Sequence, residues 1–138
     1  MLVEQQIVLV IDDDAAIRDI VATLLTEEGY AVITAGSGEE AFSHLEAVVL
    51  SLIITDMRMP VMDGWQFAAE LHRRLDGEVP LLVMTAAVDA QQRATEVDAD
   101  GAISKPFDLD EFVKSVQRLI GPAGRDPHVE VRLRNHDS

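Results

Sequence analysis

The chain has 138 residues, of which 48% are hydrophobic and none is cysteine, and its formal net charge is -14 at pH 7. This composition excludes global disorder, and the lack of cysteine excludes disulfides, thiolate metal ligands and cysteine nucleophiles, which fits a cytoplasmic protein. The acidic balance argues against direct nucleic-acid binding, and the short apolar runs argue against a membrane span or a signal peptide.

Short apolar runs, each typical of a buried strand, alternate along the chain with stretches of helical periodicity. The predicted strands cover residues 7–11, 31–35, 52–55, 81–84 and 101–104. The first predicted helix follows Asp14, which serves as its N-cap, and stops at Gly29. Its apolar face consists of Ile17, Ile20, Val21, Leu24 and Leu25.

The second and third helices are predicted from capping residues and apolar spacing. Ser37 and Glu40 form a capping box at the start of the second helix. The inward-facing residues of that helix are Phe42, Leu45 and Val49. The third helix begins near Asp63 and buries Phe67 and Leu71.

The last two predicted helices differ in strength. The stretch 88–97 is the weakest helix, because only small apolar residues lie on one of its faces. Asp108 and Glu111 open the final helix, which has a strong apolar face. That face consists of Phe112, Val113, Val116, Leu119 and Ile120.

Five strand–helix units predict an α/β fold. Fully apolar strands that alternate with helices favour a parallel sheet covered on both faces. Right-handed crossovers then produce a five-stranded, doubly wound sheet. In such sheets, ligands bind beyond the carboxyl ends of the strands.

Polar residues collect at those carboxyl ends. Asp12 and Asp13 follow the first predicted strand, Asp56 follows the third, Thr85 lies at the end of the fourth, and Lys105 follows the fifth. Each has a simpler interpretation on its own, as a helix cap, a turn residue, a strand former or a solvated lysine. Their shared location predicts one anionic pocket that needs a cation.

Oxygen ligands without cysteine or a histidine cluster favour a hard cation such as Mg²⁺. In this pocket Asp56 would be a metal ligand or a nucleophile, since aspartyl-phosphate intermediates are established chemistry. The cation and Lys105 would both neutralise phosphoryl oxygens, and Thr85 would donate a hydrogen bond to one of them.

Four stretches together resemble the receiver domain of two-component response regulators. They read VLVIDDD (8–14), IITDMRMPVMDG (53–64), VMTA (83–86) and KPF (105–107). The resemblance covers residues 5–121 and implies a receiver domain over residues 1–121. It also implies the flavodoxin-like strand order 2-1-3-4-5.

The resemblance implies that a phosphohistidine on a sensor kinase or histidine phosphotransfer protein donates its phosphoryl group to Asp56. Mg²⁺ would be held by Asp13, Asp56 and the backbone carbonyl of Arg58, while Asp12 orients a metal-bound water. The receiver would catalyse its own phosphorylation and dephosphorylation, with no separate substrate turned over.

The resemblance also assigns roles to the last strand ends. Thr85 and Lys105 would contact phosphoryl oxygens, and the bond between Lys105 and Pro106 would be cis. The small Ala86 leaves room for the phosphoryl group to enter. Signalling would switch the binding of a downstream protein partner that the sequence does not identify.

The chain departs from the family at its switch and tuning positions. Ala102 stands where receivers commonly carry an aromatic residue, so signalling is expected to run through the loop 85–88 and the weak fourth helix instead. Arg58 and Ala87 occupy the positions that tune hydrolysis. Arg58 is either a solvated loop residue or a cover that slows attack by water. Trp65 is partly buried on the third helix or contacts a partner.

Residues 122–138 are expected to form a linker and tail, because glycine, proline and aspartate follow the last helix. Alternation of apolar and charged residues also allows a short extra strand at 129–134. A third interpretation is that residues 122–138 begin an effector domain.

Four functions are compatible with parts of this pattern. A stand-alone receiver competes with the regulatory fragment of a larger DNA-binding regulator or hybrid kinase. A small-molecule phosphatase with an Asp nucleophile is remote, because Asp56 is not followed by a second acidic residue two positions on. A flavin carrier is remote as well, because aspartates stand where its phosphate loop would lie.

Overall fold

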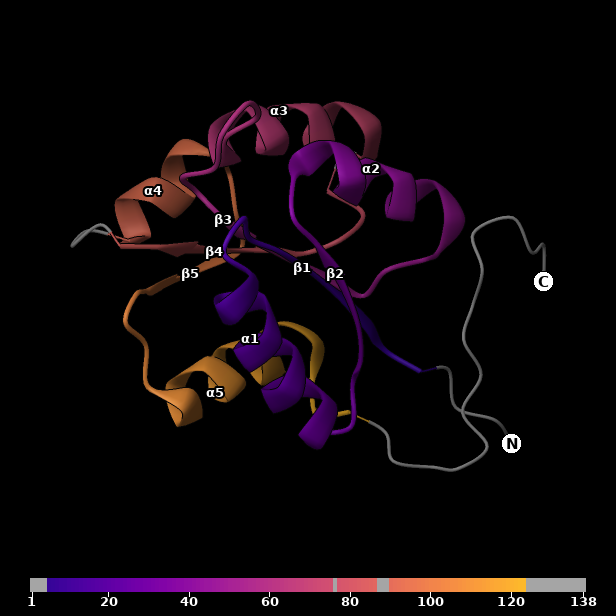
Figure 1. Ribbon diagram of the computed structural model, residues 1–138, viewed down its shortest axis with the longest axis vertical. Coiled ribbons are helices and arrows are strands. Elements are labelled where there is room, and N and C mark those ends of the chain that lie inside the picture. The colour runs from indigo at the N-terminus through magenta and orange to yellow at the C-terminus, as the bar shows by residue number, and fades with distance from the viewer. Residues whose placement is uncertain (1–4, 76, 87–89, 124–138) are drawn as a thin grey trace.

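The computed structural model describes residues 5–75, 77–86 and 90–123 (Figure 1). Five strands form one parallel sheet in the order β2-β1-β3-β4-β5. They are β1 (Ile7–Ile11), β2 (Ala31–Ala35), β3 (Leu52–Asp56), β4 (Leu81–Thr85) and β5 (Gly101–Ser104). The helices between and after them are α1 (Ala15–Glu27), α2 (Gly38–Ala47), α3 (Gly64–Leu75), α4 (Ala90–Glu96) and α5 (Leu109–Ile120).

Helices cover both faces of the sheet, as the doubly wound prediction requires. Figure 1 shows α1 and α5 on one face and α2, α3 and α4 on the other. Because strand side chains alternate between faces, the sheet supplies two cores. Leu9 packs in the cluster that contains Phe67 of α3, and Val10 packs in the cluster that contains Phe112 of α5.

The predicted caps begin their helices. Asp14 accepts a hydrogen bond from the Ala16 N–H, and Ser37 accepts one from the Glu40 N–H. Asp108 caps α5 in the same way. These contacts satisfy backbone donors that have no partner inside the helix, and they fix where each helix leaves the edge of the sheet.

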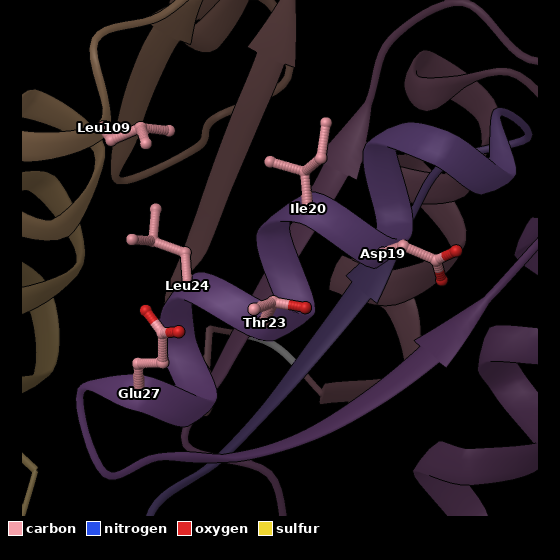
Figure 2. Close-up of a pocket in the computed structure, with 6 residues that line it drawn as sticks. All are labelled: Asp19, Ile20, Thr23, Leu24, Glu27 and Leu109. Atoms are coloured by element: carbon pink, nitrogen blue, oxygen red, sulfur yellow. The ribbon is translucent and has the colours of Figure 1, made fainter.

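Two expected core positions are wrong. Ile20 is 51% exposed, because Val21 and Leu25 already fill the space beneath α1 and Ile20 lies to one side, facing Leu109 at the start of α5 (Figure 2). Val49 lies beyond α2, which ends at Ala47 because the next residue has extended backbone angles.

Other expectations extend past the described residues. The described part of the fourth helix, α4, lies within the predicted stretch 88–97 but covers only Ala90–Glu96. Residues 87 and 88 of the loop 85–88, which include Ala87, and the possible strand at 129–134 lie outside the described residues. Among the residues that the structure describes, no helix is both long and apolar enough to cross a membrane.

Candidate functional site

The carboxyl edge of the sheet brings together side chains from four strand ends. Asp12 follows β1, Asp56 ends β3, Thr85 ends β4 and Lys105 follows β5. They converge because parallel neighbouring strands end at the same edge, which the sequence pattern anticipated. Asp12, Asp56 and Thr85 are buried, and Lys105 is partly buried.

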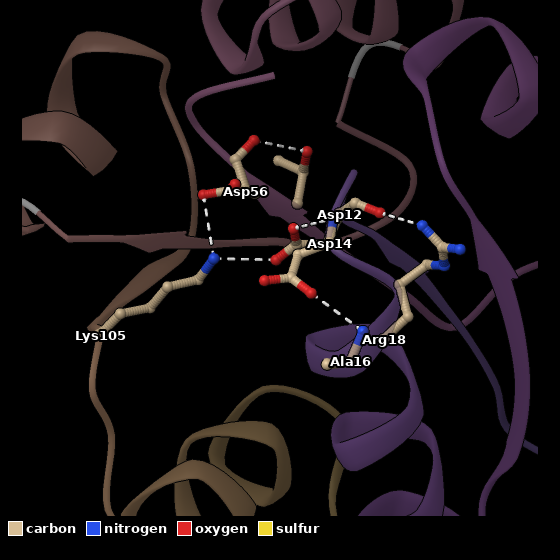
Figure 3. Close-up of polar contacts among 7 residues, drawn as sticks. Asp12, Asp14, Ala16, Arg18, Asp56 and Lys105 are labelled. Atoms are coloured by element: carbon tan, nitrogen blue, oxygen red, sulfur yellow. Dashed lines mark hydrogen bonds and ion pairs between the residues drawn. The ribbon is translucent and has the colours of Figure 1, made fainter. Parts of the chain in front are cut away.

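Asp12 is held on every side (Figure 3). Its N–H donates to the Ala35 carbonyl, and its carboxylate accepts from the Asp14 N–H at 2.9 Å and from Lys105 Nζ at 2.8 Å. Its carbonyl accepts from Arg18 Nη1 at 2.6 Å. A fully buried carboxylate requires partners of this kind, since desolvation of its charge is otherwise costly.

Asp56 is 7% exposed, and its Oδ1 lies 3.4 Å from Lys105 Nζ. Burial is the main factor that raises the pKa of the Asp56 carboxyl, and the neighbouring charge of Asp12 raises it further. Lys105 and a hydrogen bond from the Arg58 backbone oppose that rise. The Asp56 carboxylate is therefore a buried oxygen ligand whose surroundings supply less positive charge than its ionised form needs.

Lys105 lies between the two buried carboxylates. Burial alone would lower the pKa of its ammonium group, but the hydrogen bond to Asp12 and the charges of Asp56 and Asp12 outweigh this, and the pKa is raised. Its backbone N–H donates to the Thr85 carbonyl at 2.7 Å, and the Lys105–Pro106 peptide bond is cis. Lys105 is therefore a fixed cation on the β4–β5 side of the pocket.

The carboxylates provide the donor set of a cation site. Oxygen atoms of Asp12, Asp13 and Asp56 all lie within 4.8 Å of one another. Asp13 is exposed, so the cluster opens to solvent on its side. Three carboxylates face one ammonium group, and an oxygen-ligated divalent ion would balance the remaining charge. The residues present therefore fit Mg²⁺.

The loop after Asp56 depends on Gly64, which ends the motif at residues 53–64 and whose packing role the sequence pattern did not reveal. A Cβ atom at Gly64 would lie 2.7 Å from Met57 Cα and 2.9 Å from the Asp56 carbonyl oxygen. The Gly64 N–H also donates to the Met57 carbonyl at 2.9 Å. The start of α3 thus packs directly against the backbone that carries Asp56.

The other predicted site residues lie around the pocket. Arg58, Ala86 and Pro106 are exposed at its rim. Ala102 of the edge strand β5 is partly buried. Together with Gln91 of α4, it lines a hollow of about 140 Å³. The structure gives no direct contact between Ala102 and the acidic cluster.

Two features outside the predicted set also connect to the site. A hollow of about 450 Å³ borders Lys105 on the side of α1. It continues into the groove of Figure 2, where Ile20 and Leu24 of α1 lie near Leu109. On the other side of the sheet, Trp65 Nε1 donates to Glu96 Oε1 at 3.0 Å and links α3 to α4. Trp65 is partly buried, which agrees with one of its two predicted interpretations. The other interpretation, a partner contact, stays a prediction.

The chain matches the family model described as "Response regulator receiver domain" over residues 8–117. It is 39% identical over 125 residues to "Probable transcriptional regulator ycf27" of Porphyridium aerugineum, covering 87% of this chain and 51% of that protein. It is 35% identical over 115 residues to "Response regulator RR06" of Streptococcus pneumoniae, covering 82% of this chain and 52% of that protein. The chain thus spans about half the length of these curated relatives.

Solved structures of response regulators are similar to this chain as well. Chemotaxis protein CheY4 of Vibrio cholerae is similar with a TM-score of 0.76 and 32% identity, covering 83% of this chain and 98% of that chain. Response regulator protein TrrA of Thermotoga maritima, crystallised in complex with Mg(2+)-BeF, has a TM-score of 0.76 and 30% identity, covering 83% and 99%.

Proposed function

Because the chain belongs to the response regulator receiver domain family, we propose that it accepts a phosphoryl group from a phosphohistidine onto Asp56. The observation that carries this proposal is the buried Asp56 carboxylate, which lies within 4.8 Å of the Asp12 and Asp13 carboxylates and 3.4 Å from Lys105 Nζ. The donor would be a sensor kinase or a histidine phosphotransfer protein.

In the transfer, an Asp56 carboxylate oxygen attacks the phosphorus atom. A P–O bond forms, the P–N bond breaks, and its electron pair leaves with the donor imidazole. Lys105, 3.4 Å from Asp56, would neutralise charge on the phosphoryl oxygens, and Thr85, at the end of β4, would donate a hydrogen bond to one of them. Attack by water later releases phosphate and restores the carboxylate.

Asp13, Asp56 and the Arg58 carbonyl would hold Mg²⁺, and Asp12 would orient its water. When bound, the ion would supply positive charge to the acidic cluster and the phosphoryl oxygens. Asp12 also holds Lys105 at 2.8 Å, so one carboxylate organises both cationic parts of the site.

The test is the intact mass of the protein after incubation with acetyl phosphate, with and without Mg²⁺. A Mg²⁺-dependent gain of one phosphoryl group supports the proposal. If the folded protein gains no mass under either condition, self-catalysed phosphorylation from a small donor is excluded. Labelling by a phosphorylated histidine phosphotransfer protein then decides whether the site accepts phosphate at all.

We propose that the donor docks over the hollow beside Lys105, because this apolar surface adjoins the acceptor pocket. Ile20→Ser is expected to slow transfer from a histidine phosphotransfer protein several-fold relative to labelling by acetyl phosphate, which needs no docking. Ile20→Val, which keeps the surface apolar, is the matched control. Equal slowing with both donors would place the defect in the acceptor pocket and contradict this docking face.

Arg58 is exposed beside Asp56, and we propose that its side chain covers the phosphoryl group against water. Arg58→Ala is expected to shorten the phosphorylated lifetime several-fold, measured by the decay of the phosphorylated mass after the donor is removed. Arg58→Lys, which keeps the charge and a long stem, should retain more of the lifetime. An unchanged lifetime in Arg58→Ala would leave Arg58 as a solvated loop residue.

Two settings fit this function. The chain spans about half of relatives named as probable transcriptional regulators, which favours a receiver that regulates an attached effector. It also spans nearly all of the CheY4 chain, which favours a receiver that binds a separate partner. The length of the natural reading frame distinguishes the two settings.

A further inference from the structure

Arg18, which no part of the sequence analysis singled out, reaches from α1 to the acidic loop. Its Nη1 atom donates to the backbone carbonyl of Asp12 at 2.6 Å (Figure 3). The other polar groups of Asp12 are bonded to Ala35, Asp14 and Lys105. The contact from Arg18 therefore completes the set of partners that fixes the orientation of Asp12.

The Asp12 carbonyl belongs to the peptide unit that joins Asp12 to Asp13. Because that unit is planar, a rotation of the carbonyl also turns the N–H and Cα of Asp13. The Asp13 side chain is exposed, whereas Asp12 and Asp56 are buried. Side-chain packing thus restrains Asp13 less than its two neighbours in the cluster, and the backbone sets the direction of its Cα–Cβ bond and with it the positions its carboxylate can reach.

The loop after β2 supports Arg18 from the opposite side. A Cβ atom at Gly36 would lie 3.1 Å from Arg18 Nη1 and 3.7 Å from Glu40 Oε1. The Gly36 N–H donates to that Glu40 oxygen at 2.9 Å. The guanidinium group therefore packs closely against Gly36, and a side chain there would push it by a few tenths of an ångström.

We propose that Arg18 is a positioning residue for metal binding. Its hydrogen bond holds the Asp12–Asp13 peptide unit so that the Asp13 carboxylate faces Asp56. This inference rests on the proposed function, since it concerns the cation site of that function. The charge of Arg18 has the opposite effect, because a cation near the acidic cluster repels Mg²⁺. Removal of Arg18 therefore separates the two effects by the sign of the change.

The experiment measures the dissociation constant of Mg²⁺ by isothermal titration calorimetry. Arg18→Met keeps the aliphatic stem and removes the donor, and we expect it to weaken binding about tenfold, as substitutions that release a metal ligand from its support do. Arg18→Lys, which retains one donor group, should recover part of the affinity. Arg73→Met is the matched control, because it removes an equal charge from an exposed position on α3. Unchanged or tighter Mg²⁺ binding by Arg18→Met overturns the inference.

Two further measurements separate positioning from a general loss of structure. At saturating Mg²⁺, the rate of labelling by acetyl phosphate in Arg18→Met should return toward that of the natural protein, whereas a damaged fold would keep it slow. In a metal-free crystal structure of Arg18→Met, the Asp12–Asp13 peptide unit should be rotated, and an unrotated unit overturns the inference. If the natural protein binds no Mg²⁺, the metal-dependent function and this inference both fail. If it binds Mg²⁺ and Arg18→Met binds equally well, only the inference fails.

Discussion

Asp56→Asn is expected to abolish the Mg²⁺-dependent gain of one phosphoryl group from acetyl phosphate. The substitution keeps the size of the side chain but removes the nucleophilic oxygen charge at the centre of the acidic cluster. Intact mass spectrometry measures the outcome. Asp19→Asn, which removes an equal charge from an exposed position on α1, should label like the natural protein. Labelling that persists in Asp56→Asn would assign the phosphoryl group to another residue.

The same substitution should make the metal-free protein more stable at neutral pH. Burial, followed by the charge of Asp12, raises the pKa of Asp56 in the folded state. The folded state then binds that proton more tightly than the unfolded chain, so ionisation destabilises the fold as the pH rises past the ordinary carboxyl pKa. Asp56→Asn should raise the thermal midpoint at pH 7, and the gain should vanish at a pH below that ordinary pKa. A lower midpoint at pH 7 would contradict this account.

Gly64→Ala is expected to lower the free energy of unfolding by about 1–3 kcal/mol, the usual range for an atom forced into a packed region. The added Cβ would meet Met57 Cα and the Asp56 carbonyl oxygen, which are backbone atoms and cannot swing away. Urea denaturation measures the loss. Because the displaced backbone carries Asp56, labelling by acetyl phosphate should slow as well.

Gly38→Ala is the matched control, since Gly38 is also a buried glycine at the start of a helix. Its added Cβ would lie 2.6 Å from Met62 Sδ, which belongs to a flexible side chain that can move. The preference of helices for alanine over glycine applies to both positions, since each glycine is the first residue of its helix, and it cancels in the comparison. Gly38→Ala should therefore cost less than Gly64→Ala. Equal costs would show that backbone crowding is not what makes Gly64 necessary.

The sheet and the acidic pocket were predictable because both follow from local patterns. Runs such as 7–11 are apolar throughout, and strand ends at the same edge of a parallel sheet bring distant residues together. Asp12 and Asp56 are far apart in sequence, yet the strand order places β1 beside β3 and so brings them together. Lys105 follows β5, two strands beyond β3, and its long side chain reaches Asp12 from there. The caps at Asp14 and Ser37 depend only on nearby backbone groups, so they too could be predicted from the sequence.

Contacts between elements were not predictable in the same way. Periodicity places Ile20 on the apolar face of α1, but only the position of α5 decides that Ile20 stays exposed. Nothing in the spacing tells which carbonyl Arg18 meets, or that Gly64 approaches Met57. A glycine after aspartate reads equally well as a turn, so the pattern named the residue without the reason for it.

The hydrogen bond between Trp65 and Glu96 gives this protein an optical property of its own. The chain contains one tryptophan, so all of its indole emission comes from the junction of α3 and α4. Trp65 directly follows Gly64, the residue in contact with the backbone of Asp56, while Glu96 lies at the end of the helix expected to carry the signal. The indole is partly buried and bonded to a carboxylate, so its emission depends on whether α3 and α4 keep their relative position. The intrinsic fluorescence of Trp65 can therefore report changes at the junction of α3 and α4 in real time, without an added label.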